Sequence, residues 1–163
     1  MSAYSTESWS DFLVAAAGAS AALAGLVFIG VSINLTRILA FPGLPARAGQ
    51  TIVLLANALA VSLAVLAPMD SRVTTGVELL VLGVVGWLTL WVIQDRSSVD
   101  ATVRAHRRSA MVMLQIATIP FIIAGVSVLA EWGGGLYWMQ AGLILSMIVG
   151  LANGWVLLVE ILR

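Results

Sequence analysis

The sequence predicts an all-α fold, a polytopic membrane helix bundle with five transmembrane helices, its N-terminus outside and its C-terminus inside. The first observation is composition: apolar residues make up 61% of the 163 residues and charged residues 10%, whereas a soluble domain carries about 25% charged residues. The second is the presence of five apolar stretches, each near the ~20 residues that cross a ~30 Å hydrocarbon layer. The third is the uneven distribution of arginine. Together they predict one transmembrane domain over residues 1–163.

Proline, glycine and charged residues separate the five stretches. Ser8 followed by Asp11 resembles a capping box at the start of the first helix. Glu7 and Asp11 precede the apolar run, the reverse of a basic signal-peptide start, so we expect this helix to be retained. Pro120 removes a backbone donor inside the fourth helix and is expected to kink it or free a carbonyl. The helices are predicted over residues 9–39, 48–67, 73–94, 98–130 and 136–160.

The arginines give the orientation. The chain has eight arginines and no lysine, and only Arg72 falls between the second and third stretches. Arg is retained on the cytoplasmic side during insertion, so the N-terminus is expected outside and the C-terminus inside. The seven arginines on the predicted inner side are Arg37, Arg47, Arg96, Arg104, Arg107, Arg108 and Arg163.

Aromatic residues near the ends of the stretches suggest two interfacial belts, because Trp and Tyr favour the boundary between lipid and water. Trp91 and Trp155 would lie in the inner belt. The outer belt would contain Tyr4, Trp9, Trp132, Tyr137 and Trp138.

Small residues mark two places for close helix packing. Residues 15–22 are all Ala, Gly or Ser, so we expect this run inside the bundle or at a subunit interface. In the fifth stretch, small residues repeat every four positions, at Gly142, Ser146, Gly150 and Gly154. In lipid, such stripes let backbones approach closely. Two interpretations fit the second stripe: packing within one chain, or contact between copies.

A few polar residues fall inside the apolar stretches, and an amide in hydrocarbon needs a partner. One interpretation is hydrogen bonding between helices; the other is a polar pathway, in which Gln115 and Thr118 share a helix face. Glu78 lies about one turn inside the third helix, where it either reaches the interface or forms a ring at the mouth of an oligomeric pore. The candidates for a pore or polar core are Asn57, Glu78, Gln115, Thr118 and Asn153.

The long third loop contains a basic cluster. Arg104, Arg107 and Arg108 would share one face of a helix that leads into the fourth span. Such a face suits anionic lipid headgroups on the cytoplasmic side. The alternative is a docking surface for a cytoplasmic partner.

The sequence lacks the residues that most enzyme sites require. There is no Cys and no Lys, and His106 is the only histidine. This excludes a thiolate nucleophile, a lysine Schiff base and a bis-histidine haem site. Gly-x-Ser occurs three times, but the histidine is predicted in a cytoplasmic loop, away from any of these serines. We therefore expect no enzyme, no cofactor and no metal site, and the zero net charge gives no reason to expect nucleic-acid binding.

The segment Trp9–Leu39, WSDFLVAAAGASAALAGLVFIGVSINLTRIL, resembles a family of small, uncharacterised actinobacterial membrane proteins. Members are sometimes labelled modulators of the membrane protease FtsH. The resemblance covers the first helix and implies a small multi-pass membrane protein. It carries over no functional residue.

Two functions fit these observations. The first is a non-enzymatic regulatory or structural subunit of the bacterial cytoplasmic (inner) membrane, assembling with itself or with a membrane-protein partner. The second is an oligomeric ion channel or small-solute pore lined by the polar residues. Five short helices enclose little space, so a pore would require a homo-oligomer.

Overall fold

A computed structural model describes residues 3–41, 43–68, 71–96 and 101–162, the side chains of 101–110, 158 and 160–162 excepted. Every regular element in these ranges is helical, which confirms the predicted all-α class. Five helices are long and apolar enough to cross a membrane. The elements are η1 (Glu7–Trp9), α1 (Ser10–Ile33), α2 (Leu35–Ala40), α3 (Leu44–Leu66), α4 (Arg72–Arg96), α5 (Ala101–Ala130) and α6 (Leu136–Leu162).

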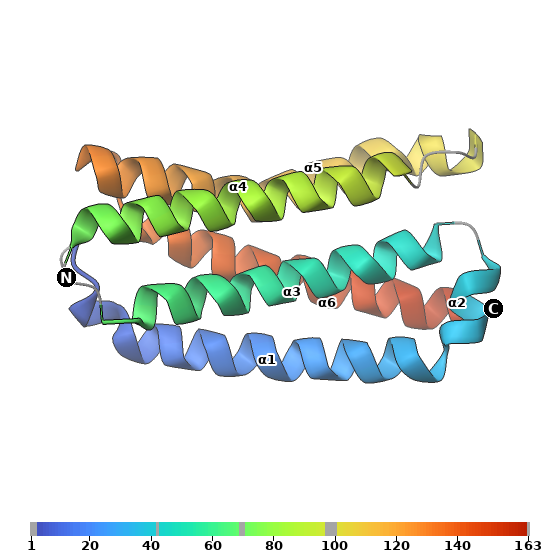
Figure 1. Ribbon diagram of the computed structural model, residues 1–163. Coiled ribbons are helices and arrows are strands. Elements are labelled where there is room, and N and C mark those ends of the chain that lie inside the picture. The colour runs from blue at the N-terminus through green and yellow to red at the C-terminus, as the bar shows by residue number, and fades with distance from the viewer. Residues whose placement is uncertain (1–2, 42, 69–70, 97–100, 163) are drawn as a thin grey trace.

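The five long helices form an up-and-down bundle (Figure 1), because short connections join antiparallel neighbours. Helix α3 is central and contacts α1, α4 and α6, while α4 and α5 form the most extensive pair. Helix α1 lies at one edge, packed mainly on α3 and only slightly on α6. The termini lie at opposite ends of the bundle, called here the N-terminal and C-terminal ends.

The predicted first helix is divided in two, which corrects the range 9–39. Helix α1 stops at Ile33, and Asn34 has φ −103° and ψ 14°. The Asn34 side-chain amide donates to the carbonyl of Gly30 at 2.9 Å, and its backbone N–H donates to the same oxygen at 3.3 Å. Asparagine thus satisfies the end of α1 locally. The chain then turns into the short helix α2.

The expected capping box at the start of the first helix is not formed. Trp9 occupies the N-cap position of α1, without a side-chain hydrogen bond. The short helix η1 precedes it instead, and the Ser10 hydroxyl donates to the carbonyl of Glu7 at 3.3 Å. The other boundaries lie within a few residues of the prediction, and α5 continues through Pro120 as one helix.

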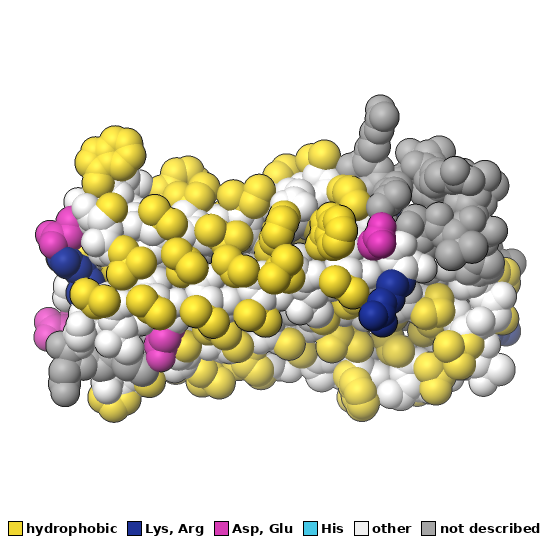
Figure 2. Space-filling model, turned by 45° about the horizontal axis from the view of Figure 1, so that its top comes forward, with side chains coloured by type: hydrophobic (Ala, Val, Ile, Leu, Met, Phe, Trp, Pro, Cys, Tyr) yellow, Lys and Arg dark blue, Asp and Glu magenta, His cyan; other side chains and the backbone are white. Residues whose placement is uncertain are grey.

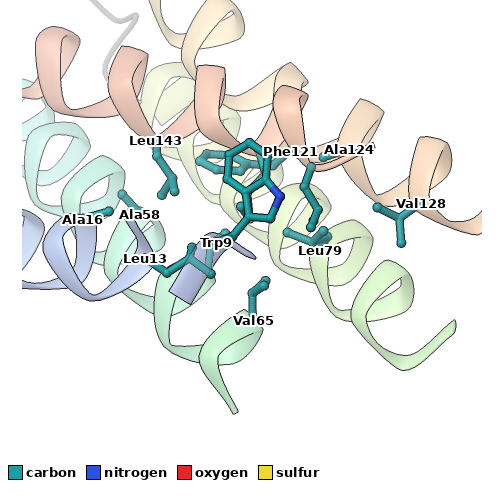
Figure 3. Packing of buried hydrophobic residues seen from close by; sticks show 13 residues of the cluster. Trp9, Leu13, Ala16, Ala58, Val65, Leu79, Phe121, Ala124, Val128 and Leu143 are labelled. Carbon is teal, nitrogen blue, oxygen red and sulfur yellow. The ribbon is translucent and has the colours of Figure 1, made fainter. Parts of the chain in front are cut away.

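The main core lies toward the N-terminal end, where Trp9 packs with buried residues of α1, α3, α4, α5 and α6 (Figure 3). Trp9 is 5% exposed and makes edge-to-face contacts with Phe12 and Tyr137, at ring-centroid distances of 6.0 and 5.1 Å. It is therefore a core residue, not a member of the expected outer belt. Trp132 is 81% exposed at the same end, as a belt residue would be.

Glycines allow α4 and α5 to approach closely. A Cβ atom added to Gly125 would lie 2.6 Å from the backbone nitrogen of Leu80, and one added to Gly76 would lie 2.7 Å from the side chain of Leu129. Residues Gly76 and Gly83 of α4 face α5 in this way, and Gly83 would meet Ile122 at 3.0 Å. Close backbone approach is the main source of helix association where the solvent is as apolar as the side chains.

Charged side chains gather toward the two ends of the bundle. On the face in Figure 2, hydrophobic side chains cover the middle, and the coloured charges lie toward the ends. At the N-terminal end, Arg72 pairs with Glu131 at 2.5 Å. Arg72 was the single arginine outside the predicted inner set, and here a carboxylate balances its charge.

Candidate functional site

The polar candidates of helix α5, Gln115 and Thr118, are engaged in local contacts. The indole N–H of Trp87 donates to Oε1 of Gln115 at 2.5 Å, which joins α4 to α5. Thr118 is buried and donates to the carbonyl of Leu114, one turn back in its own helix, at 2.8 Å. The hollow that both residues border has a volume of about 10 Å³. This is roughly the space of one water molecule.

Asn57 lies elsewhere, between α3 and α4. A Cβ atom added to Gly86 would lie 2.8–2.9 Å from the Asn57 amide group, so the side chain rests directly on the glycine backbone. Its Nδ2 atom is buried and has no hydrogen-bond partner among the described residues. Glu78 is half-buried nearly two turns inside α4, and its Oε2 is likewise buried without a partner among the described residues.

Two of the five pore candidates, Gln115 and Thr118, border one hollow. Asn57 and Glu78 are absent from the lining of the hollow beside Gln115 and Thr118. Asn153 is half-buried far along α6.

One interhelical polar pair was not predicted from the sequence. Gln50 of α3 donates from Nε2 to Oε1 of Gln94 of α4 at 2.5 Å. The two side chains are 5% and 6% exposed. Both residues lie near the ends of consecutive predicted spans on the same side of the membrane, and that shared depth was the signal available in the sequence.

The Gln50–Gln94 pair predicts a measurable coupling. Gln94→Leu is expected to cost about 1–2 kcal/mol of unfolding free energy, because it removes the acceptor that the buried Gln50 amide uses. Adding Gln50→Leu should recover part of that loss, giving a coupling of about 0.6–1.7 kcal/mol. Denaturant titration in detergent measures all four proteins. Thr89→Val, exposed on α4 with a bond only to its own backbone, serves as the control; additive leucine effects would contradict the pairing.

The small-residue stripe of α6 faces the interior of the bundle. A Cβ atom on Gly142 would lie 2.9 Å from the Phe121 ring, and one on Gly150 would lie 3.0 Å from Leu55. The Ser146 hydroxyl donates to the carbonyl of Ala117 at 3.3 Å. Gly154 faces α1. Gly142, Ser146 and Gly150 are therefore engaged in contacts within the chain, whereas a Cβ atom added to Gly154 would meet only Val27, at 3.7 Å.

The small residues of α1 are divided between two faces. Ala16, Ala17 and Ser20 are buried, so part of the run lies inside the bundle as expected. The opposite face is exposed along its length, and a Cβ atom added to either of its glycines would have no neighbour within 4 Å. We call this surface the α1 small-residue face; it consists of Ala15, Gly18, Ala22 and Gly25.

The basic cluster is located only by its backbone. Arg104, Arg107 and Arg108 belong to the first turns of α5. Their side chains lie outside the described residues.

The comparisons with known proteins give no relatives. No family model, no curated protein and no solved structure matches this chain. Within the residues that the structure describes, no three His, Cys, Asp or Glu side chains gather where they could hold a metal ion.

Proposed function

We propose that this chain is a non-enzymatic integral membrane protein that acts as a regulatory or structural subunit and assembles through α1. Its five apolar helices would lie in the bacterial cytoplasmic membrane, with the N-terminus outside. The retention of arginine on the cytoplasmic side supports this orientation. Arg104, Arg107 and Arg108 would then lie at the inner surface, where they would contact anionic headgroups.

The exposed α1 small-residue face is the observation that carries the proposal. Helix α1 is at the edge of the bundle and has most of its contacts with α3. Its outward face offers Gly18 and Gly25 with open space around them. Exposed apolar side chains can simply contact lipid. A groove of small residues, in addition, lets a second helix approach closely and gain van der Waals contact.

The small-residue stripe of α6 supports the choice of α1 by elimination. Gly142 and Gly150 already accommodate Phe121 and Leu55 of the same chain. Cβ atoms added to Gly18 and Gly25 of α1, by contrast, would have no neighbour within 4 Å. A second copy, or a partner helix with the same small-residue spacing, would fit there.

Single-cysteine cross-linking tests this assembly, because the chain has no cysteine of its own. We expect Gly18→Cys to form a disulfide-linked dimer on oxidation in membranes at high lipid dilution. A disulfide requires Cβ atoms about 4 Å apart, so only closely paired α1 helices would react. Non-reducing electrophoresis measures the dimer.

Val81→Cys is the matched control. Val81 is 49% exposed on α4 and lies as far along α4 as Gly18 does along α1. It should stay monomeric under the same oxidation. Equal dimer yields from the two variants, or none from Gly18→Cys, would refute assembly of like copies through α1.

A further inference from the structure

We infer that a groove between α1, α2 and α6 binds one acyl chain of an anionic phospholipid, with the headgroup at the C-terminal end of the bundle. The groove has a volume of about 230 Å³. Its walls come from the second half of α1, from α2 and from the last turns of α6. This site is separate from the α1 small-residue face and goes beyond the proposed assembly.

Two glycines, one from each long helix, leave room for the groove. Gly30 of α1 and Gly154 of α6 both line it. A Cβ atom added to Gly30 would have no neighbour within 4 Å, and one added to Gly154 would meet only Val27, at 3.7 Å. Helices α1 and α6 make few contacts with each other. The missing side chains thus leave a space that the bundle does not fill.

The break at Asn34 closes one end of this space. Because α1 stops at Ile33, α2 turns across the C-terminal end of the bundle. Ile38 of α2 lines the groove and is 2% exposed. A straight helix through Asn34 would carry Ile38 beyond the groove, so the short helix α2 acts as the end wall.

The chemistry of the lining selects an apolar guest. The lining consists of Leu, Val, Ile, Gly and a single tryptophan, with no charged residue. A cavity of this kind stays dry and takes an apolar guest, because water would find no hydrogen-bond partners there. In a membrane-spanning bundle the abundant apolar guest of elongated shape is a lipid acyl chain. Trp155 is 70% exposed beside the groove, and Trp is enriched where lipid chains meet headgroups.

Charge at the closed end selects the headgroup. Arg37 is exposed and directly precedes Ile38, the residue of the end wall. The C-terminal end also carries Arg47, and carboxylates at Asp95 and Glu160. A phosphate above the groove would lie at the end of the bundle that presents Arg37, and guanidinium groups suit phosphate oxygens.

Native mass spectrometry of the full chain tests the site. The protein is released from mixed micelles that contain phosphatidylglycerol and phosphatidylcholine with identical acyl chains. We expect one phospholipid per chain to survive delipidation, with phosphatidylglycerol preferred. Gly30→Leu should reduce the retained fraction roughly tenfold, because the new side chain occupies the groove without displacing neighbours. Gly154→Val fills the same space from α6 and gives a second, independent variant.

Two further variants separate the parts of the proposal. Arg37→Gln should lower the preference for phosphatidylglycerol roughly fivefold, since an Arg near an anionic surface is worth ~1 kcal/mol. Thr89→Leu is the control: it adds a leucine at an exposed position of α4, outside both the groove and the α1 small-residue face, and should leave lipid retention unchanged.

Specific results would overturn the inference. If Gly30→Leu and Gly154→Val retained as much phospholipid as the wild type, the groove would not be the binding site of the acyl chain. If Gly30→Leu instead abolished dimer formation and left lipid retention unchanged, a second copy of the protein would be the occupant. Equal retention of both lipids in the wild type would refute the assigned headgroup.

Discussion

Gly125→Ala is expected to lower the free energy of unfolding by about 2–3 kcal/mol. The added Cβ atom would lie 2.6 Å from the backbone nitrogen of Leu80 and 2.9 Å from the carbonyl oxygen of Gly76. Backbone atoms cannot rotate away as a flexible side chain can, so α4 and α5 must move apart. These two helices form the most extensive contact in the bundle, and the separation would loosen many packed atoms. Denaturant titration of the detergent-solubilised monomer measures the loss.

Gly18→Ala is the matched control and should have the opposite sign. A Cβ atom at Gly18 would have no neighbour within 4 Å, so only the backbone effect of replacing glycine in a helix remains. That effect is a gain of about 0.5–1 kcal/mol. If both variants were stabilised, α4 and α5 would not pack as closely as the structure shows.

Phe121→Ala is expected to cost about 3 kcal/mol, the low end of the range for this truncation. Phe121 is fully buried and packs against Gly142 of α6 (Figure 3 shows Phe121 in the core). The low end applies because lipid or detergent also solvates the ring in the unfolded chain. The cost of the substitution therefore comes mainly from the packing contacts that the folded protein loses. Phe28→Ala, on a side chain that is 62% exposed on α1, should change stability by less than about 0.5 kcal/mol.

A second substitution identifies the contact responsible. Gly142→Ala alone should destabilise by about 1–3 kcal/mol, because its Cβ atom would lie 2.9 Å from the Phe121 ring. In the Phe121→Ala background that clash is gone, so the cost of Gly142→Ala should largely disappear. The two substitutions should therefore couple by at least about 1 kcal/mol. Strict additivity would mean that the α6 glycine does not accommodate this ring.

The partners of the polar residues could not be predicted from the sequence. That Gln115 needs a partner follows from its place in an apolar stretch, but its partner Trp87 lies 28 positions away on another helix. The Gln50–Gln94 bond depends on the rotation of α3 against α4. Hydropathy fixes the depth of a residue in the membrane, but not the direction in which it points.

The amino-acid sequence by itself determined the all-helical class, the five apolar spans and the separation of arginine toward one end. These features depend on local composition and on the length that crosses a bilayer, so no knowledge of neighbouring helices was required. The break at Asn34 was also local, since its amide bonds to the carbonyl of Gly30 in the same helix. Glycine and proline did not mark it, and it was missed.

Only the tertiary structure decided which faces of the helices lie inside. Gly142 and Gly150 of α6 turned inward because Phe121 and Leu55 fill the space beside them, while five of the eight small residues 15–22 of α1 turned outward. In a soluble helix the contrast between polar and apolar residues reveals the buried face. Here lipid and protein interior are equally apolar, so that contrast vanishes and the fit between side chains decides.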